Sequence, residues 1–193
     1  MTLDAINAVA PILTAAIIAA TAAAAFVQLR HMRASNHISA MWSVHEMFSS
    51  KPYRDALRLV RNHLQALMQD PAFRTFVTNR TLRLPELDAP EQFVAASDAT
   101  TFIGNTYETL GNMIILGLID RHNFLRNYAW IIVGMWEQME PYVKVIRSAE
   151  RGDGLYEDFE YLTVCAREWI RRNPVAYPRG YPRILPSYKD NAV

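Results

Sequence analysis

The chain has 193 residues, with 20 Lys or Arg and 19 Asp or Glu, so its formal net charge is +1. A charge this close to zero gives no reason to expect binding to nucleic acid. The single cysteine, Cys165, excludes an intramolecular disulfide and fits a reducing compartment. Apolar residues recur at helical spacing along nearly the whole chain, which predicts an all-α fold.

The first predicted element is an uncharged stretch over residues 8–27, half of it alanine. At about 1.5 Å per residue it is long enough to cross the roughly 30 Å hydrocarbon core of a bilayer. Two alternatives are a secretion signal and a buried core helix. A signal would normally begin with positive charge, but Asp4 is the only charged side chain before the stretch. We therefore expect a single transmembrane anchor over residues 1–34.

The residues flanking the anchor predict its orientation. Arg30 and Arg33 follow the apolar stretch, and no Lys or Arg precedes it. The positive-inside rule then places the N-terminus outside and the rest of the chain in the cytoplasm.

Small residues four positions apart form two ridges along the anchor. In lipid, such residues let helices approach closely. We expect one ridge to pack against a transmembrane helix of another subunit or of a second copy of the chain. The first ridge is Ala15, Ala19 and Ala23, and the second is Ala16, Ala20 and Ala24.

A helical domain over residues 35–172 is expected after the anchor, and its helices follow from caps and prolines. The anchor helix should continue to about Phe48, with Ser50 capping a helix that carries apolar residues to Met68. Asp70 and Pro71 should start a short helix, and "LPELDAP" reads as a loop. Further helices are expected over 91–118, from 120 onward, and over 156–171, with "RGDG" as a turn. Pro141 is expected to kink or split the helix that contains it.

Basic residues near the anchor suggest contact with anionic lipid headgroups, each worth about 1 kcal/mol close to the surface. Arg54, Arg58 and Arg61 share one helical face, and the alternative is that this face is simply solvated. The predicted headgroup contacts are Arg30, Arg33, Lys51, Arg54, Arg58 and Arg61.

Motifs that would indicate catalysis are missing from the sequence. It contains no phosphate-binding loop, dinucleotide fingerprint or nucleophile elbow. The acidic pairs Glu137/Glu140 and Glu157/Glu160 lack the Glu-x-x-His partners that usually complete a di-metal bundle site. Cys165, within the apolar run "YLTVCA", is expected to be buried and inert. We therefore predict no metal, no cofactor and no enzymatic activity.

One ion pair is predicted inside the helical domain. Arg147 lies two turns after Pro141, and Glu160 begins the helix beyond the "RGDG" turn. An antiparallel return of the chain would bring the two together as a structural pair. The run "YAWIIVGMWEQM" is expected to fill the core, with a groove for a partner helix as the alternative.

The C-terminal tail, residues 173–193, has prolines at 174, 178, 182 and 186 and should be extended. Its tyrosines and arginines suit an anionic protein surface, either on a partner or on the acidic part of the same chain. The residues expected to bind are Tyr177, Arg179, Tyr181, Arg183 and Tyr188.

A family resemblance covers about 50 residues from Leu110 onward. It is carried by Leu110-Gly111, "GLID" at 117–120, Trp136, Pro141, Arg147 and Phe159-Glu160. On these residues the chain resembles an uncharacterised bacterial domain-of-unknown-function family. The resemblance implies a short N-terminal anchor followed by a helical cytoplasmic domain, and hence the inner membrane of a bacterium. It implies no activity, and the tail is not part of the pattern.

Three functions compete on the sequence alone. The first is a single-pass accessory or scaffold subunit of a membrane assembly, with membrane lipid and other membrane proteins as partners. The second is a membrane-tethered regulatory or stress-response protein that switches on binding a ligand or partner. The third is an enzyme with no recognisable motif.

Overall fold

The computed structural model describes residues 3–84, 89–150, 152 and 154–174. Every regular element in these ranges is helical, as the sequence predicts, and no strand occurs among them. The elements are α1 (Leu3–Ser49), α2 (Lys51–Leu59), the π-helix η1 (Val60–Leu64), α3 (Gln65–Leu67), α4 (Pro71–Thr81), α5 (Glu91–Ile115), α6 (Arg121–Glu150) and α7 (Glu157–Arg172).

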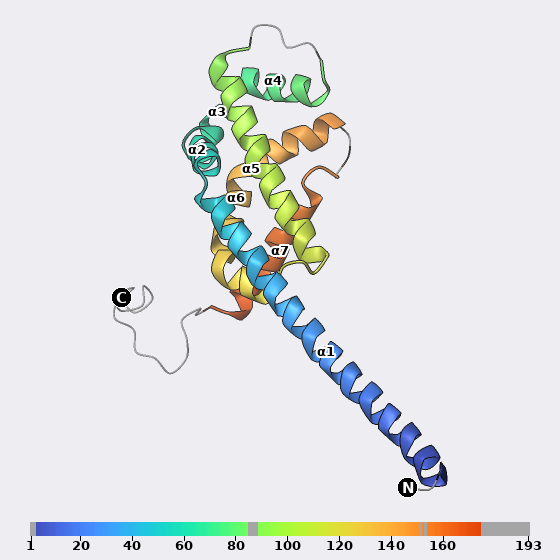
Figure 1. The fold of residues 1–193 in the computed structure, drawn as a ribbon. Coiled ribbons are helices and arrows are strands. Elements are labelled where there is room, and N and C mark those ends of the chain that lie inside the picture. Colours follow the sequence, from blue (N-terminus) through green and yellow to red (C-terminus); the bar gives the residue numbers. More distant parts are fainter. Residues whose placement is uncertain (1–2, 85–88, 151, 153, 175–193) are drawn as a thin grey trace, which may run out of the picture.

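Helix α1 is a single rod that projects from a helical bundle formed by the other elements (Figure 1). No break in the helix occurs at residue 34, where the sequence suggested a domain boundary. Only the C-terminal part of the rod packs on the bundle. Val44 is buried there, and the partly buried Ala40, Met41, Met47 and Phe48 contact the core.

Side-chain caps start three helices where the sequence predicts them. Tyr53 N donates to Ser50 Oγ at 3.3 Å, and Ala72 N donates to Asp70 Oδ1 at 2.8 Å. Asn123 N donates to Asp120 Oδ1, also at 2.8 Å. Each cap accepts a hydrogen bond from a backbone amide that has no partner within its helix.

The core of the bundle lies mainly between α5, α6 and α7, with α2 packed on the other side of α5. Tyr107, Phe124 and Phe159 are fully buried in it. The expectation that the run "YAWIIVGMWEQM" fills the core is only partly right, because Trp130 is 67% exposed and Ile131 is 41% exposed. Successive helical residues point about 100° apart, so a continuous apolar run cannot face one side.

Pro141 does not split its helix, since α6 continues through it to Glu150. Proline removes the hydrogen bond to the carbonyl four residues earlier. Here both Pro141 and Glu137 are exposed, so water can satisfy that carbonyl. Cys165 also differs from expectation, because it is half-buried rather than fully buried.

Candidate functional site

The largest apolar surface of the chain is on the projecting part of α1. Every residue from Pro11 to Met32 is exposed, including Ile12, Ile18 and Phe26, whose exposed fractions are 70%, 64% and 68%. α1 is long and apolar enough to cross a membrane, and none of its apolar window is buried by the rest of the chain. The alternative of a core helix therefore does not fit this chain on its own.

Both alanine ridges lie on this exposed surface. Ala15, Ala19 and Ala23 have no neighbour from the bundle, and neither do Ala16, Ala20 and Ala24. The fold leaves both ridges free to meet another helix without favouring either of them.

The predicted headgroup contacts separate into two groups. Arg30 is exposed on α1 just after the apolar segment, and Arg33 follows in the same helix. In contrast, α1 rises about 30 Å between Leu29 and Ser49, at about 1.5 Å per residue. The headgroup layer is only roughly 5–8 Å thick on each side of a bilayer. If an anchor is inserted along α1 at right angles to the bilayer, Lys51, Arg54, Arg58 and Arg61 lie beyond that layer, and the lipid contact expected for them stays a prediction.

The basic side chains of α2 and η1 lie on the surface of the bundle. Lys51 Nζ lies 2.5 Å from Asp55 Oδ2, and Arg58 Nη1 lies 3.6 Å from Asp55 Oδ1. Arg54 and Arg61 are exposed. Pairs of this kind on a helix surface contribute little stability.

The most elaborate polar arrangement of the bundle surrounds the first turn of α7. Glu108 of α5 accepts hydrogen bonds from Asp158 N (3.3 Å) and Phe159 N (2.8 Å), so a side chain from another helix caps α7. Asn112 Nδ2 donates to Asp158 Oδ2 at 3.1 Å. We call this arrangement, with the ring contacts of Phe159, the α7 junction.

Apolar contacts complete the α7 junction. The Phe159 ring stacks on Tyr107 with centroids 4.7 Å apart and meets Trp136 edge-on at 5.0 Å. Tyr107 in turn shares a buried hydrogen bond with Tyr53, with the two hydroxyl oxygens 2.9 Å apart. Burial raises the pKa of Tyr107 well above its ordinary value, which keeps both hydroxyls neutral.

Two glycines of α5 allow α7 to come this close. A Cβ built on Gly111 would overlap the backbone carbonyl of Asp158. A Cβ on Gly104 would lie 2.6 Å from Cζ of Tyr156, the residue before α7. Glycine is therefore required at position 111 by the spacing between the backbones of α5 and α7, whereas Gly104 leaves room for the Tyr156 ring.

Arg147 and Glu160, predicted as a structural pair, are together at the same place. Arg147 Nη1 lies 2.6 Å from Glu160 Oε2, and Arg147 Nε donates to the carbonyl of Leu155 at 2.8 Å. The Arg147 side chain is 17% exposed and that of Glu160 is 48% exposed. Arg147 therefore fixes the end of α6 to both the connection and the first turn of α7.

The polar groups of the α7 junction hold the start of α7 in place. Burial raises the pKa of Glu108, partly offset by the amides of Phe159 and Asp158 that donate to it. Its two oxygens are thus already occupied as a helix cap. A general acid or base needs a substrate within hydrogen-bonding reach, and none of the three clefts described next includes Glu108.

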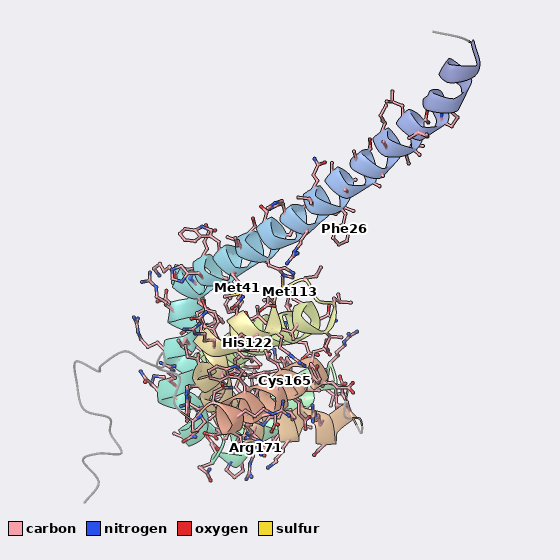
Figure 2. All side chains as sticks on the ribbon, turned by 90° about the horizontal axis from the view of Figure 1, so that it is seen from below. Phe26, Met41, Met113, His122, Cys165 and Arg171 are labelled. Atoms are coloured by element: carbon pink, nitrogen blue, oxygen red, sulfur yellow. The ribbon has the colours of Figure 1, made fainter. Side chains whose placement is uncertain are left out.

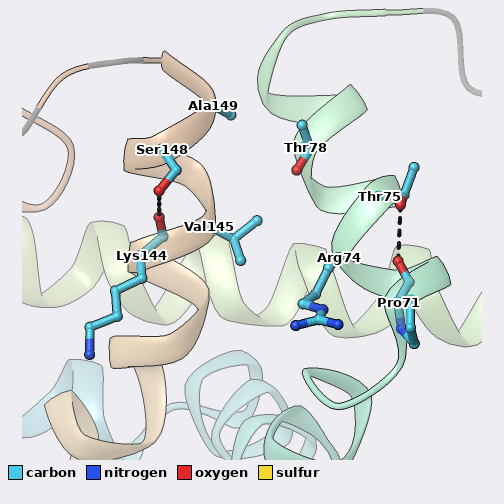
Figure 3. Close-up of a pocket in the computed structure, with 8 residues that line it drawn as sticks. All are labelled: Pro71, Arg74, Thr75, Thr78, Lys144, Val145, Ser148 and Ala149. Atoms are coloured by element: carbon cyan, nitrogen blue, oxygen red, sulfur yellow. Dashed lines mark hydrogen bonds between the residues drawn. The ribbon is translucent and has the colours of Figure 1, made fainter.

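An open cleft of about 570 Å³ lies between α4 and the end of α6 (Figure 3). Two of its three lining hydroxyls donate to the backbone, Thr75 to the Pro71 carbonyl and Ser148 to the Lys144 carbonyl, and the third belongs to Thr78. Lys144 Nζ is 2.9 Å from Glu140 Oε1. Arg74 alone presents a charge without an observed partner, so the cleft shows no pairing of nucleophile and base.

A second cleft, of about 370 Å³, lies between the segment from α2 to α3 and α5, and is lined mostly by apolar side chains. A third, of about 500 Å³, lies where α1 leaves the bundle. Met41 and Trp42 of α1 face Asn123 and Tyr128 of α6 there. His37 also lines it, and its Nδ1 atom is buried without a hydrogen-bond partner.

Metal ligands do not cluster in the part of the chain that the structure describes. No three His, Cys, Asp or Glu side chains there are placed to hold an ion. The tail residues expected to bind a partner, Tyr177 to Tyr188, lie outside the described residues.

These features define a class of protein: a helical bundle that carries one long helix with an apolar, exposed segment. The chain belongs to the family described as a domain of unknown function (DUF4760), whose model matches residues 13–169. No curated protein and no solved structure matches the chain. The match begins inside the apolar segment of α1 and ends before the tail, so the family model includes both most of the apolar segment and the bundle.

Five of the residues that carry the resemblance lie close together in the structure. Gly111, Trp136, Arg147, Phe159 and Glu160 all contribute to the α7 junction. Sequence reasoning found the Arg147–Glu160 pair but missed Glu108, because a carboxylate in the middle of one helix gives no local sign that it caps another. The family pattern at these positions is explained by packing, and so does not indicate an active site.

Proposed function

We propose that the protein is a single-pass, membrane-anchored accessory or scaffold subunit that holds its helical domain at a membrane assembly and performs no catalysis. The observation that carries the proposal is the complete exposure of residues 11–32 on a chain whose bundle has its own closed core. An apolar surface of this size on a soluble chain would favour aggregation, whereas lipid and a partner helix would cover it.

The proposed topology follows the positive-inside rule, with the N-terminus outside and the bundle in the cytoplasm at the inner membrane of a bacterium. Arg30 and Arg33 would mark the cytoplasmic edge of the span. The proposed partners are membrane lipid and the transmembrane helix of another subunit or of a second copy. The near-zero net charge gives no support for nucleic acid as a partner.

Single-cysteine crosslinking tests the helix contact in the full chain. With Cys165→Ser as background, cysteines are introduced separately at Ala19, Ala20 and Ile18 in native membranes. Ala19 and Ala20 represent the two ridges, and Ile18 lies about 100° from Ala19 and 160° from Ala20 around the helix. We expect crosslinking from one ridge and little from Ile18. Equal yields at all three positions, or none, would contradict a specific helix contact.

We also propose, from its composition alone, that the C-terminal tail makes a separate contact with the assembly. Residues 174–193 lie beyond the last buried core residue, Trp169, and beyond the family match. Deleting them should leave the circular dichroism of the protein unchanged and lower its recovery with the assembly. Unfolding of the shortened chain would show that the tail belongs to the fold instead.

A regulatory role is the second candidate, and the cleft where α1 leaves the bundle favours it. A ligand or peptide bound between Trp42 and Asn123 would alter the angle between α1 and the bundle. The distance between spin labels on α1 and α6 tests this in lipid nanodiscs. If the distribution of distances between the two spin labels does not change when native membrane extract is added, that result would count against switching.

A further inference from the structure

The bundle has two ends, and they differ in chemistry. The turn between α5 and α6 and the C-terminal end of α7 lie at the end that faces the apolar part of α1, whereas α4 lies at the opposite end (Figure 1). In Figure 2, which shows the molecule from below, Met113 is labelled close to α1 and Arg171 on the side of the bundle away from it.

The α5–α6 turn, residues 115–118, is aliphatic at three of its four positions. Ile115 is 50% exposed, Leu116 63% and Leu118 52%. Turns are normally polar, because their side chains face water. We call residues 115–118 the apolar turn.

The backbone amides of the apolar turn donate hydrogen bonds to the last turn of α5. Gly117 has φ +68°, its amide donates to the Ile114 carbonyl, and the Leu118 amide donates to the Met113 carbonyl. This is a Schellman motif, in which the left-handed residue is usually glycine. The amides of the turn therefore stay paired if the turn moves from water into a less polar layer, where an unpaired backbone group is costly.

The height of the apolar turn along α1 places it near the end of the span. Asp120, two residues after the turn, lines the same cleft as His37 and Ile38 of α1. His37 is about 12 Å beyond Leu29 at 1.5 Å per residue. Transmembrane helices tilt by about 20° on average, so an ordinary tilt toward the turn would lower it into the headgroup layer.

Basic side chains follow the apolar turn in the sequence, and others lie at the end of α7. Arg121 and Arg126 are exposed in the first turns of α6. At the end of α7, Arg171 and Arg172 both pair with Glu168, and the adjacent Arg171 lowers the pKa of Glu168 to about 2. Arginines next to exposed aliphatic residues match anionic headgroups next to acyl chains.

We propose that the apolar turn is a second membrane contact, in which Ile115, Leu116 and Leu118 enter the interfacial layer of the bilayer and Arg121 and Arg126 contact anionic headgroups. The proposal rests on the membrane anchor of the proposed function. It adds that lipid itself, and not only α1, sets the orientation of the bundle.

Depth-dependent fluorescence quenching tests the second contact in the full chain. In the Cys165→Ser background, a polarity-sensitive probe is attached at Leu116→Cys, Ile18→Cys or Leu82→Cys. Leu82 is a matched control, 45% exposed just after α4 at the opposite end of the bundle. The proteins are reconstituted in vesicles of phosphatidylcholine and phosphatidylglycerol, with and without doxyl-labelled lipid.

We expect the probe at residue 116 to emit further to the blue than the probe at residue 82, and to lose intensity with shallow doxyl lipid. Replacing Arg121 and Arg126 with glutamine should reduce that quenching in anionic vesicles. Quenching at Ile18 without quenching at Leu116 would overturn the second contact and leave the anchor intact. A blue-shifted probe at Leu116 that doxyl lipid does not quench would indicate a protein contact and overturn it too. No quenching at Ile18 would remove the anchor itself.

Discussion

The α7 junction and the apolar segment of α1 differ in where their contacts are made. At the junction, Gly111, Glu108, Arg147 and Phe159 find all their observed partners within the chain. Along residues 11–32 of α1, the side chains are exposed and the chain supplies no cover. Substitutions at the junction should therefore change the stability of the fold, whereas substitutions in α1 should change association and leave the bundle unaffected.

The largest effect is expected for Gly111→Ala. The added methyl group would overlap the Asp158 carbonyl, a backbone atom that cannot rotate away, so α5 and α7 must separate. We expect a loss of about 3 kcal/mol in the free energy of unfolding, the upper range for overpacking. Chemical denaturation of the full chain in mild detergent measures it.

Gly134→Ala is the matched control for this substitution. Nothing lies within 4 Å of a Cβ built at Gly134, which is exposed within α6. Alanine there should stabilise the protein by about 0.5–1 kcal/mol, because glycine is the poorer helix former. Equal effects of the two substitutions would show that the close approach of α5 and α7 is not required.

Arg147→Met should have the next largest effect. It removes the hydrogen bonds to Glu160 and to the Leu155 carbonyl. A hydrogen bond from a charged donor contributes about 1.5–3 kcal/mol to the free energy of unfolding. Glu160 is half-exposed and can be hydrated when alone, so adding Glu160→Gln should recover only about 0.5–1 kcal/mol.

The exposed Lys144–Glu140 pair provides the comparison for Arg147. Lys144 is 73% exposed, so Lys144→Met should cost no more than about 0.5 kcal/mol. Strictly additive losses for Arg147→Met and Glu160→Gln would mean that the two side chains do not stabilise each other.

Glu108 should give a smaller effect with a defined pH dependence. Burial raises its pKa above the ordinary 4.5, so between 4.5 and the raised value the folded state holds more protons than the unfolded state. Its contribution to stability is therefore fully present below about pH 4.5 and is lost as pH rises through the folded pKa. Relative to Glu108→Gln, the wild-type melting temperature should fall over that window.

Two further variants complete the test of Glu108. Glu108→Ala removes the cap of α7 and should cost about 1 kcal/mol. Glu137→Gln changes an exposed carboxylate of α6. It should leave the pH dependence of the melting temperature the same as in the wild type. A rise of wild-type stability relative to Glu108→Gln between pH 4.5 and 7 would reverse the assigned sign.

The smallest effect on the fold is expected for Ala19→Leu. This side chain meets no part of the bundle, so the melting temperature should not change. Association through the anchor should weaken if the first ridge is the contact, because leucine keeps the helices apart. Ala20→Leu tests the second ridge in the same way, with sedimentation in detergent as the measurement. Unchanged association for both variants would exclude the alanine ridges as the contact.

The sequence by itself determined the helical fold class, the starts of three helices and the exposed apolar helix. These features depend on local chemistry: the period of apolar residues, and caps such as Ser50, Asp70 and Asp120 whose side chains bond to amides nearby in the chain. The Arg147–Glu160 pair was also within reach, because one short connection separates the two helices.

Only the tertiary structure decided which distant residues share a place. Glu108 caps a helix that begins 49 residues later in the chain, at Glu157, and Asp120, just after the apolar turn, lines a cleft together with His37 of α1, which is far away in the sequence. Conversely, the basic residues 51–61 follow the anchor closely in sequence, yet the rigid rise of α1 carries them away from it. Helical periodicity fixes which side of a helix is apolar, but the packing of the helices decides which end of the bundle each residue reaches.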